Sequence, residues 1–600
     1  MLGVDTGGTF TDLVTDGGRV VKVPSTPDDP AAAVQAAVAR AADGDGEPPD
    51  VLAHGTTVAT NALLQHRGGR VALVATRGFS DVIEIARQRR PSLYDLHVDR
   101  PPPLVPRELR FEVSGRLDAN GRELEPFDGV VPDIGAVDGV AVCLLHADLE
   151  PAHERAVARV LAARGVDVTC SHDVSPEFRE YERTVTTVAD AMLRPICADY
   201  LHRVAALAGE VLVMTSAGGL VPLADAAERP ATLLLSGPAA GVRAAATITR
   251  ACGYPDAVSF DMGGTSTDVC LVRGGVPEPS PLRHVAGYPI RLPSLDVHTI
   301  GAGGGSVARL DAGGALSVGP ESAGARPGPA CYGLGGTAAT VTDADLLLGR
   351  VPADAPFAGL GRLDVHGARR ALERAGVTPA GLVAVVDAAM ERAVRSVTVE
   401  QGVDPRELAL VAFGGAGPLH ACAIADALAM RVVIVPARAG AFSAAGLVAA
   451  PRRCEIVRSW PRRLDVDGLE PALAALAREA RAGVGAGTSR NARADATVET
   501  FVDCRYVGQS HELTVRTPDD FPAEHRRRNG FSRPGAPVEV VALRARATRP
   551  GRLDVDELPA VARRRVRGPE VVVEDDCTLW VPDGWTAEPG PTGAWVLRRS

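Results

Sequence analysis

The sequence contains no cysteine pair in the C-x-x-C spacing on which structural zinc and iron–sulfur sites depend. Its ten cysteines are scattered between Cys143 and Cys577. In a chain of 600 residues this scatter is typical of reduced, buried thiols, and it predicts a cytoplasmic protein. The N-terminus lacks a basic segment followed by an apolar one, so we expect no signal peptide.

Long apolar runs are missing as well. No stretch of about 18 residues is free of charged and turn-forming residues, so we expect no membrane span. Lysine is almost absent, since Lys22 is the only one, and the excess of arginine is typical of a GC-rich genome. The net charge of -10 argues against nucleic acid as a partner. The GxxxxGK[ST] motif of P-loop enzymes does not occur.

The order of apolar runs and helical patterns predicts an α/β architecture. Residues 71–75 and 139–145 are typical of buried strands, and residues 151–164 and 184–194 of helices. Strands that alternate with helices favour sheets covered by helices. The alternation continues beyond a new strand at 212–216, which places a domain boundary near 200–210.

The last quarter of the chain differs in character. Residues 499–505, 511–516 and 538–544 alternate between apolar and polar side chains, as antiparallel strands do. We therefore expect three domains, 1–200, 201–450 and 451–600, of which the third is a smaller α+β or β-rich domain.

One motif occurs twice. Residues 3–14 and 259–270 both contain the pattern D-x-G-G-T-x-T-D, with six identical positions out of eight. Chance rarely repeats such an octet, so the two copies predict two similar domains, each beginning with the same hairpin. The identical pairs are Asp5/Asp261, Gly7/Gly263, Gly8/Gly264, Thr9/Thr265, Thr11/Thr267 and Asp12/Asp268.

The repeated motif has the composition of a phosphate-binding turn. Glycine has no Cβ, so a phosphate can approach the backbone N–H groups of Gly7-Gly8 and of Gly263-Gly264. The threonine hydroxyls are further donors, and the aspartates can hold Mg²⁺. A single copy could be an ordinary hairpin turn, but two facing copies favour a clamp on ATP.

A third glycine-rich segment suits the nucleoside. Residues 408–413 form an apolar strand that is followed by Gly414, Gly415, Ala416 and Gly417 and by a helix over 421–430. The backbone of such a strand–turn–helix unit can pack against adenosine. The alternative is an ordinary turn between a strand and a helix.

The order of these elements resembles the actin–hexokinase–Hsp70 superfamily. The resemblance implies duplicated actin-like (ribonuclease H-like) ATPase domains that close over ATP and Mg²⁺. Helices over 183–196 and 440–450 are the expected crossing helices between the lobes.

Longer stretches resemble the hydantoinase A / 5-oxoprolinase family, which includes N-methylhydantoinase and acetone carboxylase subunits. The stretches cover nearly the whole chain in order. Asp190 and Asp345 depart from an expected Asn, and Arg326 from an expected Asp. The matching segments are GVDTGGTFTD (3–12), HGTTVATNALL (54–64), REYERTVTT (179–187), SGPAAGV (236–242), FDMGGTSTDV (260–269), DVHTIGAGGGSVA (296–308), GPACYGLGG (328–336), TVTDADLLLGR (340–350), FGGAGPLHA (413–421) and DCRYVGQSHELTV (503–515).

The resemblance implies that ATP activates a cyclic amide or a ketone by phosphoryl transfer, with a hydantoinase B-type subunit as the partner in a hetero-oligomer. Asp5 and Asp261 are then candidates for catalysis and for metal binding, beside the motif residues that hold nucleotide. Asp296 and His298 are further catalytic candidates, because i,i+2 spacing on a strand puts both on one face, where they could also bind a second divalent metal. For His298, a structural role as a hydrogen-bonded histidine is an equally good interpretation. The substrate candidates are His54, Thr56, Thr57, Asn61 and Arg183, of which Arg183 could equally form an ion pair at a domain seam.

Three functions stay open at this point. The first is an ATP-dependent amidohydrolase subunit for a hydantoin, 5-oxoproline or another lactam. The second is a subunit of an ATP-dependent ketone carboxylase. The third, a non-catalytic actin-like ATPase, is disfavoured because the paired cysteines of a reductase activator and the helical lid of a chaperone are both missing.

Overall fold

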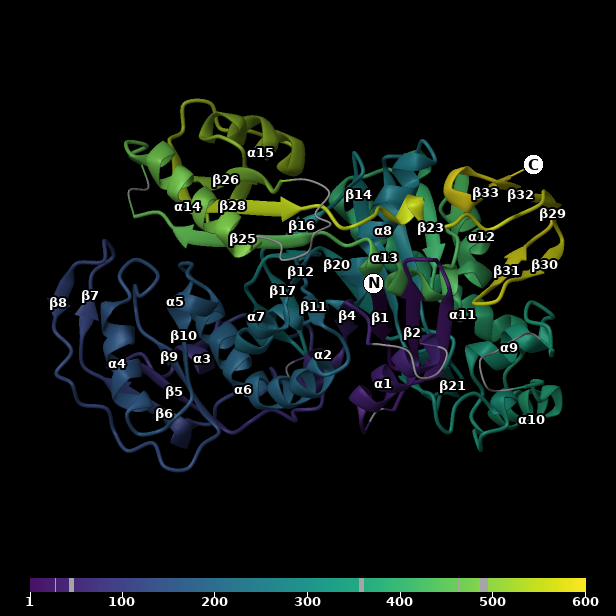
Figure 1. The fold of residues 1–600 in the computed structure, drawn as a ribbon, viewed down its shortest axis with the longest axis horizontal. Helices are drawn as coiled ribbons and strands as arrows, with labels where there is room; N and C mark the ends of the chain where they lie inside the picture. The colour runs from purple at the N-terminus through teal and green to yellow at the C-terminus, as the bar shows by residue number, and fades with distance from the viewer. Residues whose placement is uncertain are drawn as a thin grey trace.

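The computed structural model describes residues 1–26, 28–42, 48–95, 97–354, 361–461, 464–485 and 495–599. They form two large sheets flanked by helices and a smaller four-stranded sheet at one end of the molecule (Figure 1). This architecture confirms the α/β class. Among the residues described, no helix combines the length and apolarity that a bilayer crossing needs.

The first large sheet joins both ends of the sequence. Its ten strands run in the order β27-β26-β28-β25-β12-β11-β4-β1-β2-β3. The strands are β1 Leu2–Thr6, β2 Phe10–Thr15, β3 Val20–Pro24, β4 Val51–Thr56, β11 Glu210–Met214, β12 Leu220–Pro222, β25 Arg452–Ser459, β26 Thr497–Tyr506, β27 Leu513–Val515 and β28 Val538–Arg549.

The second large sheet runs in the order β15-β14-β13-β23-β24-β33-β32-β29, and β20 pairs with β14 beside this path. The strands are β13 Ala257–Met262, β14 Thr267–Arg273, β15 Val276–Pro277, β20 Val297–Ile300, β23 Ala409–Phe413, β24 Val432–Val435, β29 Val566–Arg567, β32 Trp585–Pro589 and β33 Trp595–Arg599.

The two sheets repeat one motif. In the first, β1 pairs antiparallel with β2 and parallel with β4, and in the second β13 pairs antiparallel with β14 and parallel with β23. The register aligns Asp5 with Asp12 in one hairpin and Asp261 with Asp268 in the other. The duplication read from the octets is therefore present in the strand pairing.

Two helices cross between the sheets, α8 (Gly237–Ala251) and α13 (Phe442–Val448). They approach so closely that a Cβ on Gly446 would lie 2.4 Å from the carbonyl oxygen of Ala240. The expectation for residues 440–450 thus holds, whereas that for residues 183–196 is wrong. Those residues belong to α6 (Glu180–Ala205), which packs on β9 of the small sheet instead.

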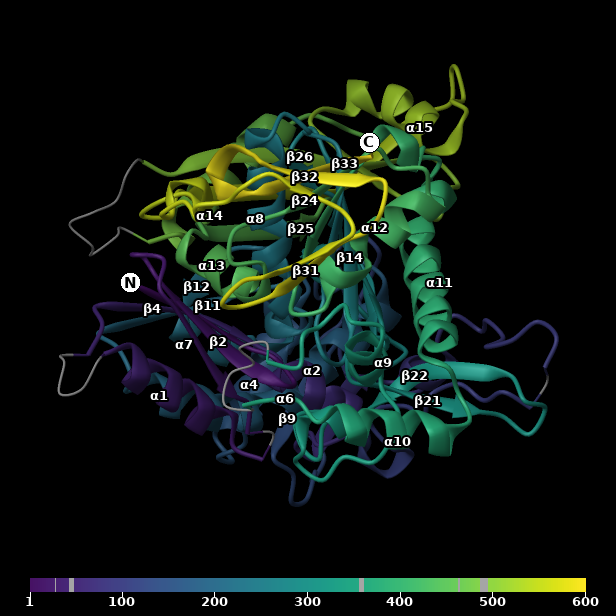
Figure 2. The same cartoon turned by 90° about the vertical axis from the view of Figure 1, so that its right-hand side faces the viewer.

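The small sheet and the outer helices complete the fold. The small sheet has the order β10-β9-β5-β6, and its strand β9 is fully buried, as its apolar sequence predicts for a parallel strand. Figure 2 shows the long helix α11 beside the second sheet, above the helices α9 and α10. The strands are β5 Val71–Thr76, β6 Arg110–Val113, β9 Gly139–Cys143 and β10 Val168–Cys170; the helices are α1 Pro30–Ala41, α2 Val58–Leu64, α4 Ala152–Ala162, α9 Val341–Leu347, α10 Val365–Ala375, α11 Pro379–Val397, α12 Gly417–Ala427, α14 Leu469–Gly483 and α15 Phe521–Asn529.

Strand pairing crosses the predicted domain boundaries. Strands β11 and β12 belong to the first sheet although they follow residue 200, and the segment after residue 450 is shared between both sheets. Buried ion pairs fix this segment: Arg544 lies 2.8 Å from Asp503 and 3.4 Å from Glu177 of the N-terminal half. The division into three domains stays a prediction.

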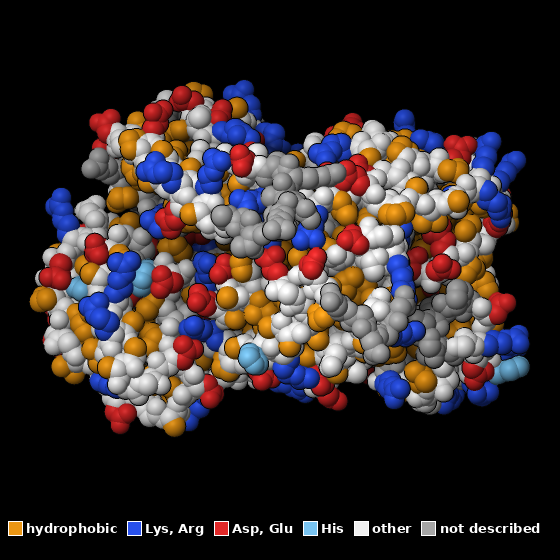
Figure 3. Space-filling model, in the orientation of Figure 1, with side chains coloured by type: hydrophobic (Ala, Val, Ile, Leu, Met, Phe, Trp, Pro, Cys, Tyr) orange, Lys and Arg blue, Asp and Glu red, His pale blue; other side chains and the backbone are white. Residues whose placement is uncertain are grey.

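Acidic and basic side chains are interspersed over the face of the molecule drawn in Figure 3, and neither sign forms a continuous area there.

Candidate nucleotide-binding cleft

A cleft lies where the two duplicated hairpins face each other. Its lining includes most of the residues that the motifs predicted to bind nucleotide, and these come from both sheets. They are Asp5, Gly7, Gly8, Thr9 and Asp12 from the first hairpin, Asp261, Gly263, Gly264, Thr265 and Asp268 from the second, and Gly414, Gly415 and Ala416 from the third glycine-rich segment.

The two hairpin turns contact each other through the same pair of residue types. A Cβ on Gly264 would lie 2.5 Å from Oγ1 of Thr9, and a Cβ on Gly8 would lie 3.3 Å from Cγ2 of Thr265. Each glycine therefore leaves room for the threonine of the other turn. The turns lie close enough to grip one ligand from both sides.

Four carboxylates crowd the floor of this cleft. Burial and repulsion from Asp12 raise the pKa of Asp5 to about 7, although Lys22 opposes this shift. Burial also raises the pKa of Asp268 to about 6, and burial together with Asp268 and Asp5 raises that of Asp261 well above its usual value. Such a set of desolvated carboxylates favours a bound cation.

The donor set fits ATP with Mg²⁺. Among the described residues, Oγ1 of Thr9 is buried without a hydrogen-bond partner, although it points at the opposite turn. An unpaired buried hydroxyl costs free energy unless a ligand accepts its hydrogen bond. The carboxylate oxygens of Asp5 and Asp261 are the hard ligands that Mg²⁺ prefers.

The third glycine-rich segment contacts the second hairpin directly. Gly414 has φ +79°, and a Cβ there would lie 2.4 Å from Oδ1 of Asp261. The backbone N–H of Ala416 donates to the carbonyl of Met262. Gly417 begins α12 but does not line the cleft. The first three positions of this segment thus form a wall of the cleft, as the nucleoside prediction requires.

Some predicted phosphate ligands have partners within the protein instead. Oγ1 of Thr11 lies 3.1 Å from Oγ of Ser25, and Oγ1 of Thr267 donates to the carbonyl of Ala302 at 2.6 Å. Both threonines are fully buried and do not line the cleft. Their hydroxyls brace the hairpins, so a phosphate-binding role for them has no support from the geometry.

Of the five substrate candidates, only Thr57 lines the cleft. Its Oγ1 donates to the carbonyl of Thr6 and accepts from Nδ2 of the exposed Asn61. Thr56 is buried, and its Oγ1 accepts from the N–H of Val58.

His54 and Arg183 lie in the interior. Nε2 of His54 is 2.6 Å from the hydroxyl of Tyr200, and burial lowers the pKa of His54 to about 4, so the imidazole is neutral. Arg183 donates to Asp148 and to the carbonyl of Leu144. These internal hydrogen bonds indicate a structural role for both side chains, and neither lines the cleft.

Asp296 and His298 point away from the cleft. The register of β14 and β20 pairs Asp268 with Thr299, whose hydroxyl donates to the Asp268 carboxylate. Side chains alternate along a strand, so His298 and Asp296 lie on the face opposite Thr299. Asp296 accepts from Nε2 of Gln401, and His298 is exposed. The catalytic role of this pair stays a prediction.

Several lining residues were not predicted, and those that carry charge fall into three groups. Lys22 lines the cleft beside Asp12, and a turn over 574–578 reaches it from the C-terminal part of the chain. Asp345 also lines it, from α9. The one signal that could have found Lys22 is that it is the only lysine of the sequence. No sequence pattern linked the 574–578 turn to the first hairpin, which lies more than 500 residues earlier in the chain.

Asp345, one of the departures from the family pattern, belongs to a buried charged cluster. His420 lies between Asp345 at 3.3 Å and Asp387 at 2.7 Å. Burial alone would lower the pKa of His420, but the two carboxylates raise it to about 10. The second departure, Asp190, accepts from the N–H of Ala231, and Arg326 is exposed.

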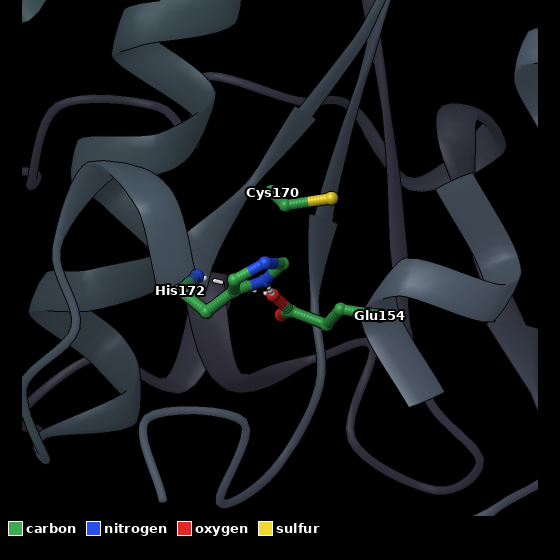
Figure 4. A group of neighbouring side chains, drawn as sticks. All are labelled: Glu154, Cys170 and His172. Atoms are coloured by element: carbon green, nitrogen blue, oxygen red, sulfur yellow. Dashed lines mark hydrogen bonds and ion pairs between the residues drawn. The ribbon is translucent and has the colours of Figure 1, made fainter. Parts of the chain in front are cut away.

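Two clusters among the described residues have the composition of a metal site, Glu154–Cys170–His172 and Glu574–Asp576–Cys577. Figure 4 shows Nδ1 of His172 against the Glu154 carboxylate, at 2.6 Å. That carboxylate also accepts from Ser171 and from two backbone N–H groups. The hydrogen bonds of the first cluster therefore indicate a structural role. A second divalent metal beside Mg²⁺ stays a prediction.

Comparisons with known proteins show the family of the chain. Residues 1–165 match the hydantoinase/oxoprolinase N-terminal region, and residues 183–456 match hydantoinase/oxoprolinase. Caprolactamase subunit alpha of Pseudomonas jessenii is 33% identical over 688 residues, which cover 99% of this chain and 98% of that protein. 5-Oxoprolinase 1 of Arabidopsis thaliana is 35% identical over 74% of this chain and 41% of its own length.

Two solved structures share the fold. The ATP-dependent caprolactamase of Pseudomonas jessenii has a TM-score of 0.85 and 31% identity, with all of both chains covered. A nucleotide-free acetone carboxylase has a TM-score of 0.77 and 25% identity, over 100% of this chain and 99% of that one.

Proposed function

The chain belongs to the hydantoinase/oxoprolinase family, and from this we propose that it is the ATP-dependent subunit that activates a cyclic amide for ring opening. The observation that carries the proposal is the cleft in which two D-x-G-G-T-x-T-D turns face each other. The names of the relatives support the substrate class, because caprolactam and 5-oxoproline are both lactams.

The chemistry follows from the weakness of an amide as an electrophile. Transfer of the γ-phosphoryl group to the carbonyl oxygen makes the amide carbon more electrophilic. Water can then attack that carbon, and the ring opens when the C–N bond breaks and the nitrogen takes up a proton. A second water molecule releases phosphate from the resulting acyl phosphate and leaves the free carboxylate. Phosphoryl transfer needs positioning and charge neutralisation more than covalent help. Mg²⁺, when bound, would supply much of that neutralisation.

The residues of the cleft divide these tasks. Backbone N–H groups of Gly7, Gly8, Gly263 and Gly264 can hold phosphate oxygens, with the hydroxyl of Thr9 as a further donor. Asp5 and Asp261 stand at the ends of β1 and β13 and can hold the cation. Thr57 borders the cleft beside Gly237, where the amide can lie.

We also propose a B-type partner subunit, because relatives are designated as subunits alpha and gamma. A cytoplasmic location is supported by the ten cysteines, all of which are unpaired.

A ketone carboxylase is the second candidate, since the acetone carboxylase structure matches the whole chain. The test is phosphate release by the purified chain with its partner, measured with lactams and hydantoins and, separately, with ketones and bicarbonate. Stimulation by a cyclic amide without bicarbonate supports the proposal. Stimulation that requires both a ketone and bicarbonate overturns it in favour of the carboxylase, and failure to bind ATP overturns both.

A further inference from the structure

The charge of the cleft is strongly one-sided. Among the described residues that line it there is no arginine or histidine, and Lys22 is the one cation. The acidic lining residues are Asp5, Asp12, Asp261, Asp268, Asp345, Glu574, Asp575 and Asp576. A triphosphate that enters such a cleft meets one protein ammonium group.

Lys22 is held beside the first phosphate turn by three contacts. It stands on β3 directly opposite Asp12 of β2, and its Nζ lies 2.6 Å from the Asp12 carboxylate. Nζ also donates to the carbonyl of Gly440 at 3.2 Å and lies 5.1 Å from the centre of the Phe10 ring. The side chain is 18% exposed, so a ligand in the cleft can reach it.

The contact with Gly440 joins three separate parts of the chain. Gly440 lies two residues before the crossing helix α13, and its N–H donates to the Asp576 carboxylate at 2.7 Å. Asp576 belongs to the 574–578 turn, which Arg563 fixes through Glu574 at 2.6 Å. The lysine therefore sits where the phosphate turn, the crossing segment and the C-terminal turn meet.

We infer that Lys22 is a catalytic residue whose ammonium group contacts the transferred phosphoryl group and neutralises the charge that develops on it. The inference rests on the proposed function. A phosphoryl oxygen can replace the Gly440 carbonyl as the acceptor of Nζ, and a charged acceptor binds an ammonium more strongly than a neutral one. In a site closed to water such an interaction contributes strongly to catalysis.

The equivalent position of the second hairpin has no cation. Thr299 of β20 stands opposite Asp268, as Lys22 stands opposite Asp12. The duplicated site thus has one ammonium group, on one side.

The composition of the chain allows a direct test, because Lys22 is its only lysine. An acyl-phosphate derivative of ATP carries an acyl group on its terminal phosphate. The neutral amine attacks the acyl carbon, the bond from that carbon to the phosphate oxygen breaks, ATP leaves and the amine loses a proton to solvent. An amide on Nζ therefore shows that Nζ lay close to the terminal phosphate of the bound nucleotide.

We expect acylation of the wild-type protein at Lys22 at pH 8, and its suppression by excess ATP with Mg²⁺. Mass analysis of peptides separates this product from acylation of the Met1 amino group. If ATP binds with a measurable Kd but Lys22 stays unmodified, the inference fails and the proposed function stands. If ATP does not bind, the proposed function itself fails.

Variants separate a catalytic lysine from a merely structural one. If Lys22 contacts the terminal phosphate, the wild type should bind ATP more tightly than ADP. Lys22→Gln should lower kcat by about 100-fold and remove this difference in Kd. Lys22→Arg should keep part of the activity and part of the difference in Kd. The matched control is Arg40→Gln, on the exposed end of α1, which should match the wild type. A Lys22→Gln protein that keeps its ATP preference and loses only stability would overturn the inference.

Discussion

Replacement of Asp5 by Asn should stabilise the protein in the absence of nucleotide and metal. The pKa of Asp5 is raised from 3.8 to about 7 by burial and by the nearby Asp12. A raised pKa means that the folded state resists ionisation. Stability attributable to Asp5 is therefore full below pH 4 and is lost as the pH rises toward 7.

The size of the effect follows from the shift. Each pKa unit corresponds to about 1.4 kcal/mol, so ionised Asp5 reduces the free energy of unfolding by up to about 4 kcal/mol at pH 8. Asn carries no charge and removes this loss. At pH 5 Asp5 is still protonated in the folded state, so the gain from Asp5→Asn should be smaller by more than half.

The assay is thermal unfolding of both proteins with EDTA at pH 5 and pH 8. Asp583→Asn, an exposed change in the turn before β32, serves as the control and should shift neither melting temperature. Mg²⁺ and ATP at 100 times the wild-type Kd should narrow the difference at pH 8, since they stabilise the wild type by about 2.7 kcal/mol and should bind the variant more weakly. An Asp5→Asn protein less stable than wild type at pH 8 with EDTA would refute the reasoning.

Three further predictions concern packing and buried charge. Gly264→Ala places a Cβ 2.5 Å from Oγ1 of Thr9, so ATP binding measured by calorimetry should weaken at least tenfold. Gly17→Ala, whose Cβ would meet only Oγ1 of Thr15 at 3.6 Å, should leave it unchanged. Arg544→Met leaves Asp503 buried without its main partner and should cost about 3–5 kcal/mol in denaturant unfolding; a loss below 1 kcal/mol would contradict the role of this pair. Because the pKa of His420 is raised to about 10, the stability it contributes should be full below pH 6 and be lost as the pH rises toward 10, and melting curves of His420→Gln should lack that slope.

The hairpins of the cleft could be predicted because their chemistry lies within a few consecutive residues. An Asp at the end of a strand, two glycines and a threonine specify the turn, and they predict a phosphate ligand for it. The facing contact of Gly8 with Thr265 could not be predicted in the same way, because it depends on how the two sheets approach each other.

Asp296 and His298 show where strand patterns stop being informative. The i,i+2 spacing predicts a common face for the two side chains, but a spacing does not say which face meets the cleft. The pairing of β20 with β14 decides this, since it turns Thr299 toward Asp268. His54 illustrates the same limit. Its polar motif suggested a substrate contact, but a polar side chain can equally form hydrogen bonds inside the protein, as His54 does with Tyr200.

The duplicated halves are equivalent in backbone but not in charge. Lys22 compensates Asp12 in the first half, whereas Asp268 in the second half has only the hydroxyl of Thr299. Uncompensated negative charge therefore gathers around Asp261 and Asp268, and a divalent cation should bind nearer to that side. The ammonium group stands on the other side. The two turns are thus nearly symmetric in backbone, whereas Lys22 on β3 and Thr299 on β20 make the two sides of the cleft differ in charge.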